Sequence, residues 1–170
     1  PELNFVGQVT FPYVISDGNG GTATANEIIT VENVNDAPVA VDDSYTTDEE
    51  TPVTLDPLET GIDDSDLDGD TLSITSINGV TINGGVQVIT VPNGVVNIDA
   101  NGVITFTPEL NFVGQVTFPY VISDGNGGTA TANEIITVEN TNDAPVAVDD
   151  SYTTDEETPV TLDPLETGID

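Results

Sequence analysis

The stretch that decides the fold is VTFPYVISDGNGGTATANEIITV, residues 116–138, in which two apolar runs flank a glycine-rich turn. Apolar side chains alternate with mostly polar ones from Val116 to Ile122, which predicts a strand with one buried face. The SDGNGG segment that follows predicts a hairpin turn. In the second run, alternate positions are apolar, and Glu134 falls in the same alternating set as these apolar residues. We therefore expect a β-bulge near Asn133, and we expect Glu134, like its sequence copy Glu27, to face solvent.

The same signals continue along the rest of the chain. Asn-Gly and Asp-Gly pairs recur at short intervals, and Val-, Ile- and Thr-rich runs of strand length lie between them. No run has a helical period. Roughly seven or eight strands per module of this size are typical of a Greek-key β-sandwich. We therefore predict an all-β protein made of tandem β-sandwich modules.

A long internal repeat sets the module length. Residues 1–33 recur at 108–140, and the copy continues to residue 170 with an offset of 107 residues. Val34 against Thr141 is the one difference between the copies. A period of this length is one domain, and the proline of each NDAP segment ends the strand before it and stiffens the connection. The predicted domains are residues 1–35 (the C-terminal part of one module), 36–142 (a complete module) and 143–170 (the N-terminal part of the next).

The charge of the chain is entirely acidic. Its 170 residues include 31 Asp and Glu, no Lys, Arg or His, and no Cys, Met or Trp. Nucleic-acid binding through phosphates needs Lys or Arg, and an anionic membrane surface would repel the chain. Catalysis through His, Cys, Lys or Arg is excluded, as are disulfides and zinc held by His or Cys. The only cross-link between parts of the fold that this composition allows is a cation bound by oxygen ligands.

An acidic loop precedes one of the predicted strands. DDSDLDGD, residues 63–70, places carboxylates at alternate positions around a glycine. Carboxylates this close repel one another unless a cation lies among them, and such a loop can wrap a hard cation with oxygen ligands. The loop begins like an EF-hand, but Thr75 stands at the twelfth position and strands flank it, so an EF-hand is not expected. We predict calcium here, against the alternative of a solvated acidic loop, because the chain has no counter-charge of its own.

Other acidic places have the character to complete the ligand set. They are the linker at residues 32–36, the Asp48-Glu49-Glu50 turn, Glu109 and the Asp124 turn. Asp42 and Asp43 either join these ligands or are ordinary surface acids.

Three strings carry a family resemblance. They are NDAPVAVDDSYTTDEETPVTL at 35–55, DSDLDGDTLSITS at 64–76 and FPYVISDGNGGTATA at 118–132. Together they resemble the cadherin-like (bacterial Ig-like, VCBS-type) tandem repeats of giant bacterial surface adhesins and biofilm proteins. The likeness covers essentially the whole module. It implies a secreted, calcium-loaded sandwich of the cadherin and immunoglobulin type that serves as a spacer at the cell surface.

The resemblance also implies where calcium binds, because cadherin-type domains bind it at the junctions between modules. NVNDAP at 33–38 is similar to the cadherin linker motif, though one residue shorter. Asp64 and Asp66 resemble the D-x-D pair of the downstream module, and Asp124 resembles the Asp of its later turn. The predicted calcium ligands are Glu2, Asn33, Asn35, Asp36, Glu49, Glu50, Asp64, Asp66, Asp68, Asp70, Glu109, Asp124, Asn140, Asn142 and Asp143.

These observations favour a structural extender. Calcium would bridge adjacent modules of the same chain and turn them into a stiff rod that supports cell adhesion or biofilm formation. The alternative is a module that associates with like chains in an extracellular filament or matrix. An enzyme is not expected, because a site repeated in every module, without an aromatic platform, does not suit glycoside hydrolysis.

Overall fold

The structure is a computed structural model that describes residues 2–58 and 64–162. It divides into two units, one up to Glu139 and one from Asn140 onward, which are described separately. The described residues form eleven strands and no helix, which confirms the predicted all-β class. The strands are β1 (Gly7–Ser16), β2 (Thr22–Val31), β3 (Asp43–Asp48), β4 (Val53–Leu55), β5 (Ser73–Ile77), β6 (Val80–Thr81), β7 (Gln87–Val91), β8 (Gly94–Ile98), β9 (Ile104–Pro108), β10 (Gly114–Ser123) and β11 (Thr129–Glu139). A helix able to cross a bilayer is not found among these residues.

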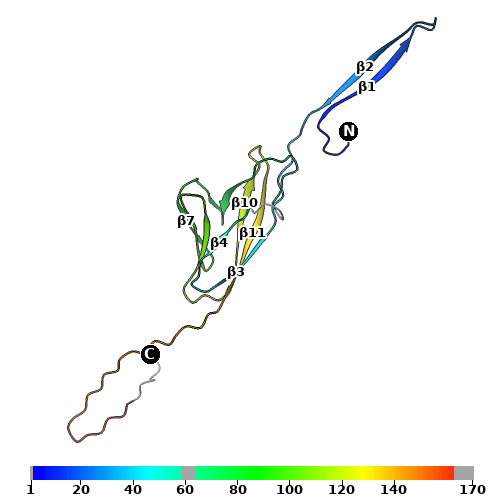
Figure 1. Cartoon of the computed structure of the whole chain (residues 1–170). Coiled ribbons are helices and arrows are strands. Elements are labelled where there is room, and N and C mark those ends of the chain that lie inside the picture. The colour runs from blue at the N-terminus through cyan, green and yellow to red at the C-terminus, as the bar shows by residue number, and fades with distance from the viewer. Residues whose placement is uncertain (1, 59–63, 163–170) are drawn as a thin grey trace. The chain divides into compact units, whose positions relative to one another are not determined.

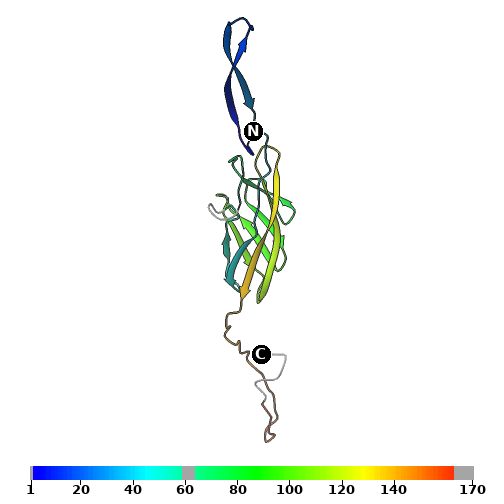
Figure 2. The ribbon, with the colours of Figure 1, turned by 90° about the vertical axis from the view of Figure 1, so that its right-hand side faces the viewer.

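Strands β3 to β11 build a two-sheet sandwich, and the predicted β-sandwich is confirmed. One sheet has the order β3-β11-β10-β5-β6 and the other the order β4-β9-β8-β7. β3 runs parallel to β11, and the other pairs are antiparallel. Figure 1 shows β7 and β4 on one side of the module and β3, β10 and β11 on the other. In the view of Figure 2 the long β10–β11 hairpin runs along the module.

Apolar side chains of both sheets fill the space between them. β10 alternates buried and less buried positions, so that Val116, Phe118, Tyr120 and Ile122 all point inward. The ring of Phe118 packs against that of Phe106 on β9, with ring centroids 6.2 Å apart and planes tilted by 36°. Such tilted aromatic pairs add to the stabilisation that comes from burial alone.

Two details of the β10–β11 hairpin differ from the sequence prediction. The predicted bulge near Asn133 is absent, because the register runs without a shift from Gly114↔Val138 to Ser123↔Thr129. The irregularity lies instead between Val121 and Ile122, where β10 pairs with β5. Since β11 keeps its period of two, Glu134 stays on the inward face opposite Phe118. The prediction that Glu134 faces solvent is therefore wrong, and its side chain is only 1% exposed.

The hairpin β1–β2 repeats the sequence and register of β10–β11 in a different environment. In the described residues β1 pairs only with β2. Phe11 is accordingly 45% exposed, whereas its copy Phe118 is 1% exposed. Glu27 is exposed, as predicted, for the same reason. Local sequence therefore sets the strands and their register, and the neighbouring strands and the facing sheet decide what is buried.

Residues 140–162, the described part of the second unit, contain no strand. Their sequence repeats 33–55, which includes β3 and β4. In the first unit β3 pairs with β11 and β4 pairs with β9. Strand formation in this segment therefore depends on partners supplied by the rest of a module.

Candidate metal centre

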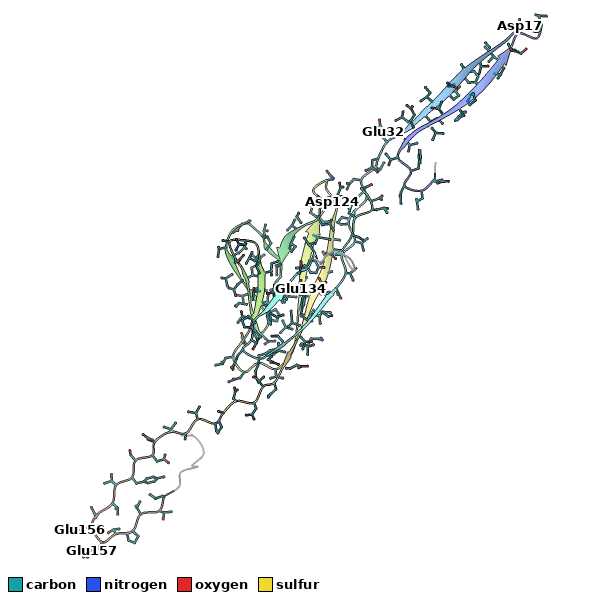
Figure 3. The ribbon with its side chains drawn as sticks, in the orientation of Figure 1. Asp17, Glu32, Asp124, Glu134, Glu156 and Glu157 are labelled. Atoms are coloured by element: carbon teal, nitrogen blue, oxygen red, sulfur yellow. The ribbon has the colours of Figure 1, made fainter. Side chains whose placement is uncertain are left out.

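Three carboxylates converge at one end of the sandwich. Asp66 and Asp70 belong to the acidic loop before β5, and Asp124 opens the turn between β10 and β11 (Figure 3). One oxygen from each lies within 4.8 Å of the others. Asp124 is buried, with an exposed fraction of 4%, and the two loop residues are partly buried. The acidic loop and the hairpin turn, 54 or more residues apart, thus form one acidic group.

The acidic loop folds around Asp66. Its Oδ1 accepts the backbone N–H groups of Asp68 at 2.9 Å and Asp70 at 3.2 Å. Gly69 has φ of 78°, a left-handed conformation that glycine adopts without a steric penalty. The loop leaves Asp66 Oδ2 buried with no hydrogen-bond partner among the residues described. Because buried polar atoms are nearly always partnered, this oxygen is a candidate to bind a cation.

The β10–β11 turn orients the third carboxylate. Asp124 Oδ1 accepts the backbone N–H groups of Asn126 at 2.8 Å and Gly128 at 2.9 Å. A Cβ at position 128 would overlap the Asp124 carboxylate and lie 2.8 Å from Ala37 Cα, so glycine is required there. The turn therefore holds Asp124 directly against the linker.

The linker is tied to both acidic segments by hydrogen bonds. Asn35 Nδ2 donates to Asp124 Oδ2 at 2.8 Å, and the Asp36 backbone N–H donates to Asp68 Oδ2 at 2.7 Å. Asn126 Nδ2 donates to Asp70 Oδ2 at 2.7 Å. The hydrogen bond from Asn35 holds the pKa of Asp124 below its usual range, although desolvation opposes this effect. Asp124 is therefore ionised at neutral pH and available as a ligand.

The chemistry of this group is that of a hard-cation site. Every donor atom that it offers is a carboxylate, amide or backbone oxygen. Calcium takes about six to eight such oxygens at roughly 2.3–2.6 Å. No Lys, Arg or His exists in the chain to neutralise the carboxylates. Asp66, Asp70 and Asp124 could hold the ion, with Asp68, Asn35 and Asp36 close enough to contribute.

Three of the remaining predicted ligands, Asp64, Glu49 and Glu50, lie apart from this group. Asp64 points elsewhere: its Oδ1 accepts the Val41 N–H at 2.8 Å, and its carboxylate contacts the Tyr120 hydroxyl. Asp63 lies outside the described residues. Glu49 and Glu50 follow β3 at the far end of β11, where the Glu49 N–H donates to Glu139 O at 2.8 Å. Glu2 and Asn33 are exposed and line one hollow together with Asp36 and Asp68. Glu109 is exposed and is not part of the three-carboxylate group. Asn140, Asn142 and Asp143 are exposed residues of the second unit. A metal role for these residues stays a prediction.

Two polar side chains of the module were not predicted to have a role. Asn126 joins the hairpin turn to Asp70, and only its place within the SDGNGG turn hinted at this. Glu134 is buried among apolar side chains. Glu134 falls in the same alternating set as its buried neighbours, and this pattern indicates that its side chain is buried. The expected bulge near Asn133 hid that signal.

The two packed sheets and the acidic group at one end define an immunoglobulin-like sandwich module. The model of the bacterial Ig domain family matches residues 35–137, and the chain therefore belongs to this family. Domains of this family are commonly extracellular or surface-exposed. This membership supports the bacterial Ig-like part of the resemblance seen in the sequence.

The chain also has partial similarity to several solved structures. An endo-fucoidan hydrolase of glycoside hydrolase family 107 is 24% identical, with a TM-score of 0.39, over 80% of this chain and 19% of that protein. A nucleoside hydrolase-related hypothetical protein from Saccharophagus degradans is 18% identical, with a TM-score of 0.37, over 63% of this chain and 26% of its own. The EC1-3 segment of mouse clustered PcdhgC3 is 16% identical, with a TM-score of 0.37, over 77% of this chain and 42% of its own. The chain thus spans less than half of each of these proteins. No curated protein matches it.

Proposed function

We propose that this chain is part of a tandem array of structural modules in a secreted bacterial surface adhesin, stiffened by calcium at the junctions between modules. One observation carries the proposal. The linker residue Asn35 is hydrogen-bonded to Asp124, which belongs to the group of three carboxylates. A cation at this group would tie the linker to the module that follows it.

Electrostatics supports a bound divalent cation. The chain has a formal net charge of -31, and such a density of like charge destabilises the compact state through self-repulsion. A cation that binds only the folded module adds stability in proportion to RT ln(1 + [L]/Kd). Asp66 Oδ2 is buried and has no hydrogen-bond partner among the described residues, so a bound cation would give it one.

The expected affinity for calcium indicates in which compartment the site is filled. Extracellular calcium modules have Kd values of roughly 10⁻⁴ to 10⁻³ M, so their sites fill outside cells and stay largely empty in cytosol. Modules joined by short linkers otherwise move relative to one another. Calcium would then act as the signal that stiffens the array after secretion.

The test compares two aspartates with the same local sequence. Asp124 lies in the carboxylate group, and its copy Asp17 opens the β1–β2 turn, where it is exposed. Thermal unfolding followed by circular dichroism in millimolar calcium and in EDTA should show a Tm lower by many degrees in EDTA. Asp124→Asn should shrink that difference, and Asp17→Asn should leave it unchanged. Equal Tm values with and without calcium in the unmodified chain would contradict the proposal.

Stiffening is tested separately from stability. Small-angle scattering of a protein with several repeats should give a larger radius of gyration in calcium than in EDTA. Sedimentation velocity under the same two conditions tests the alternative function. A monomer in both excludes self-association into a filament, and a calcium-dependent polymer would favour it over the extender.

A further inference from the structure

The outer edge of β2, the edge that faces away from β1, is unpaired, although the same edge of its sequence copy is paired. β2 is the copy of β11, and within the described residues it pairs with β1 alone. β11 is bordered by β10 on one side and by β3 on the other. An unpaired edge presents a row of backbone N–H and C=O groups that can accept a further strand. A strand that pairs with β2 here would take the place that β3 has beside β11.

The pairing of β3 with β11 shows which sequence fits this edge. The two strands run parallel, with Glu134 opposite Asp43 and Glu139 opposite Asp48. The Glu49 backbone N–H then donates to Glu139 O at 2.8 Å and continues the ladder. The sequence of β3, DSYTTD, is therefore one that the β11 sequence accepts, in a defined register.

The same two sequences occur a second time in the chain. Residues 150–155 repeat DSYTTD, and residues 27–32 repeat the part of β11 that pairs with β3. Residues 150–155 form no strand. The register of the complete module would place Glu27 opposite Asp150 and Thr30 opposite Thr153.

The turn that follows DSYTTD is already formed in this second copy. Thr154 Oγ1 donates to Thr158 O at 2.7 Å. Its copy in the complete module, Thr47 Oγ1, makes the equivalent hydrogen bond at 2.8 Å. Glu157 has φ of 60°, a left-handed value that its copy Glu50 shares. The segment therefore has the local structure of the β3–β4 connection and, within the described residues, no strand beside it.

The two outer edges of the β1–β2 hairpin are not equivalent. The Asp17 N–H donates to Gly21 O, and hydrogen-bonded pairs alternate from there along an antiparallel hairpin. By this alternation, Pro12 of β1 and Thr30 of β2 lie where the backbone nitrogen faces away from the other strand. Proline has no N–H to donate, so it interrupts the outer edge of β1. β2 contains no proline, and its outer edge is continuous.

We propose that residues 150–155 of a second copy of this chain pair in parallel with the outer edge of β2. The interface joins two different surfaces, and each chain has one of each, so the assembly is head-to-tail and open-ended. It needs no cation, because the ladder consists of backbone hydrogen bonds. It joins one chain to another, whereas the calcium proposed above acts between modules of one chain, and the two proposals are therefore independent.

A disulfide trap tests both the partner and the register, because the chain has no cysteine of its own. Thr30→Cys and Thr153→Cys are combined in one chain, which is oxidised in EDTA at about 0.15 M salt, where the Debye length is about 8 Å. A ladder of linked chains on a non-reducing gel is the expected result. A disulfide found only within single chains would overturn the proposal, because the strand would then come from the same molecule. The absence of any disulfide would overturn it as well.

Matched cysteine pairs control for geometry and for random collision. Thr46→Cys with Thr137→Cys should form a disulfide within one chain, because these two exposed residues lie opposite each other in the complete module. Thr10→Cys with Thr153→Cys should give no ladder, because Thr10 is an exposed residue of β1, which separates it from the outer edge of β2. A ladder of equal yield from this second pair would refute the register.

Proline variants test the association without a cross-link. Sedimentation velocity of the unmodified chain in EDTA should give a weight-average coefficient that rises with protein concentration. Thr30→Pro removes an N–H from the outer edge of β2 and should abolish this rise, whereas Thr10→Pro, on the outer edge of β1, should preserve it. Far-UV circular dichroism verifies that both variants are folded. A rise that persists in Thr30→Pro, or that appears only with calcium, would overturn the strand pairing and leave calcium at the junction untouched.

Discussion

The Asn35 side-chain amide donates a hydrogen bond of 2.8 Å to Asp124 Oδ2, across 89 residues of sequence. The linker that precedes the module is thus held by the turn between β10 and β11, the last two strands of the module. The acidic loop accepts a hydrogen bond from the same linker, because the backbone N–H of Asp36 donates to Asp68 Oδ2. Any cation at this end of the sandwich would act on the linker and the module together.

Asn35→Ala should weaken calcium binding at the three-carboxylate group by roughly tenfold, the effect of losing one well-placed interaction. The amide holds Asp124 in place and keeps its pKa low, so its loss leaves the carboxylate less ordered and easier to protonate. Isothermal titration with calcium measures the effect. Asn101→Ala is the control, since Asn101 also donates to an aspartate carboxylate, Asp99 Oδ2 at 3.3 Å, and is not among the predicted calcium ligands. Equal affinities in the two variants would rule out the coupling of linker and turn.

Gly128→Ala should destabilise the module by about 1–3 kcal/mol, the usual cost of forcing an extra methyl group into a packed place. The new Cβ would overlap the Asp124 carboxylate and press on Ala37 and Pro38. Urea unfolding measures the loss. At the copy, Gly21, the added Cβ meets only the exposed side chain of Asp17, so Gly21→Ala should change stability little. A neutral Gly128→Ala would mean that linker and turn are not packed together.

Much of the fold could be predicted from the sequence, because strand patterning is local. The alternation of β10 and the SDGNGG turn were sufficient to place that hairpin, and the hairpin forms in both copies with the same register. Burial was less predictable. Phe11 and Phe118 have identical flanking residues, and only the second has a facing sheet to cover it.

The residue types of the candidate metal centre could be predicted from the sequence, but not all of the individual residues that meet there. Asp66, Asp70 and Asp124 were all proposed as ligands, and they meet. Asp64 was placed with them because it alternates with Asp66, yet it turns toward Tyr120, since successive residues of a loop need not share a face. The prediction that Glu134 faces solvent was wrong, because an acidic residue in the alternating set of core positions suggested a bulge. A chain without bases gives no hint of what could balance a buried charge.

Phe118→Ala should lower the free energy of unfolding by about 3–5 kcal/mol, whereas Phe11→Ala should change it by far less. The difference follows from burial, because Phe118 packs on Phe106 and Phe11 is largely exposed. Chemical denaturation of both variants under the same conditions checks the pair. Similar losses at the two positions would show that the β1–β2 hairpin is covered in solution.

Stability in EDTA should fall as pH rises from about 4.5 to about 8, and Glu134 should be the cause. Its pKa is near 4.5 in the unfolded chain and about 8 in the folded one. The folded state therefore holds a proton that the unfolded state has lost in this range. The contribution of Glu134 to stability is full below pH 4.5 and is lost as pH passes through 8, with a slope of at most about 1.4 kcal/mol per pH unit.

Urea unfolding at several pH values measures this slope of stability against pH. Glu134→Gln should flatten it, because glutamine stays neutral and keeps the shape of the protonated acid. Glu27→Gln should retain it, and a Glu134→Gln profile that parallels the unmodified chain would show that Glu134 ionises freely in the folded protein.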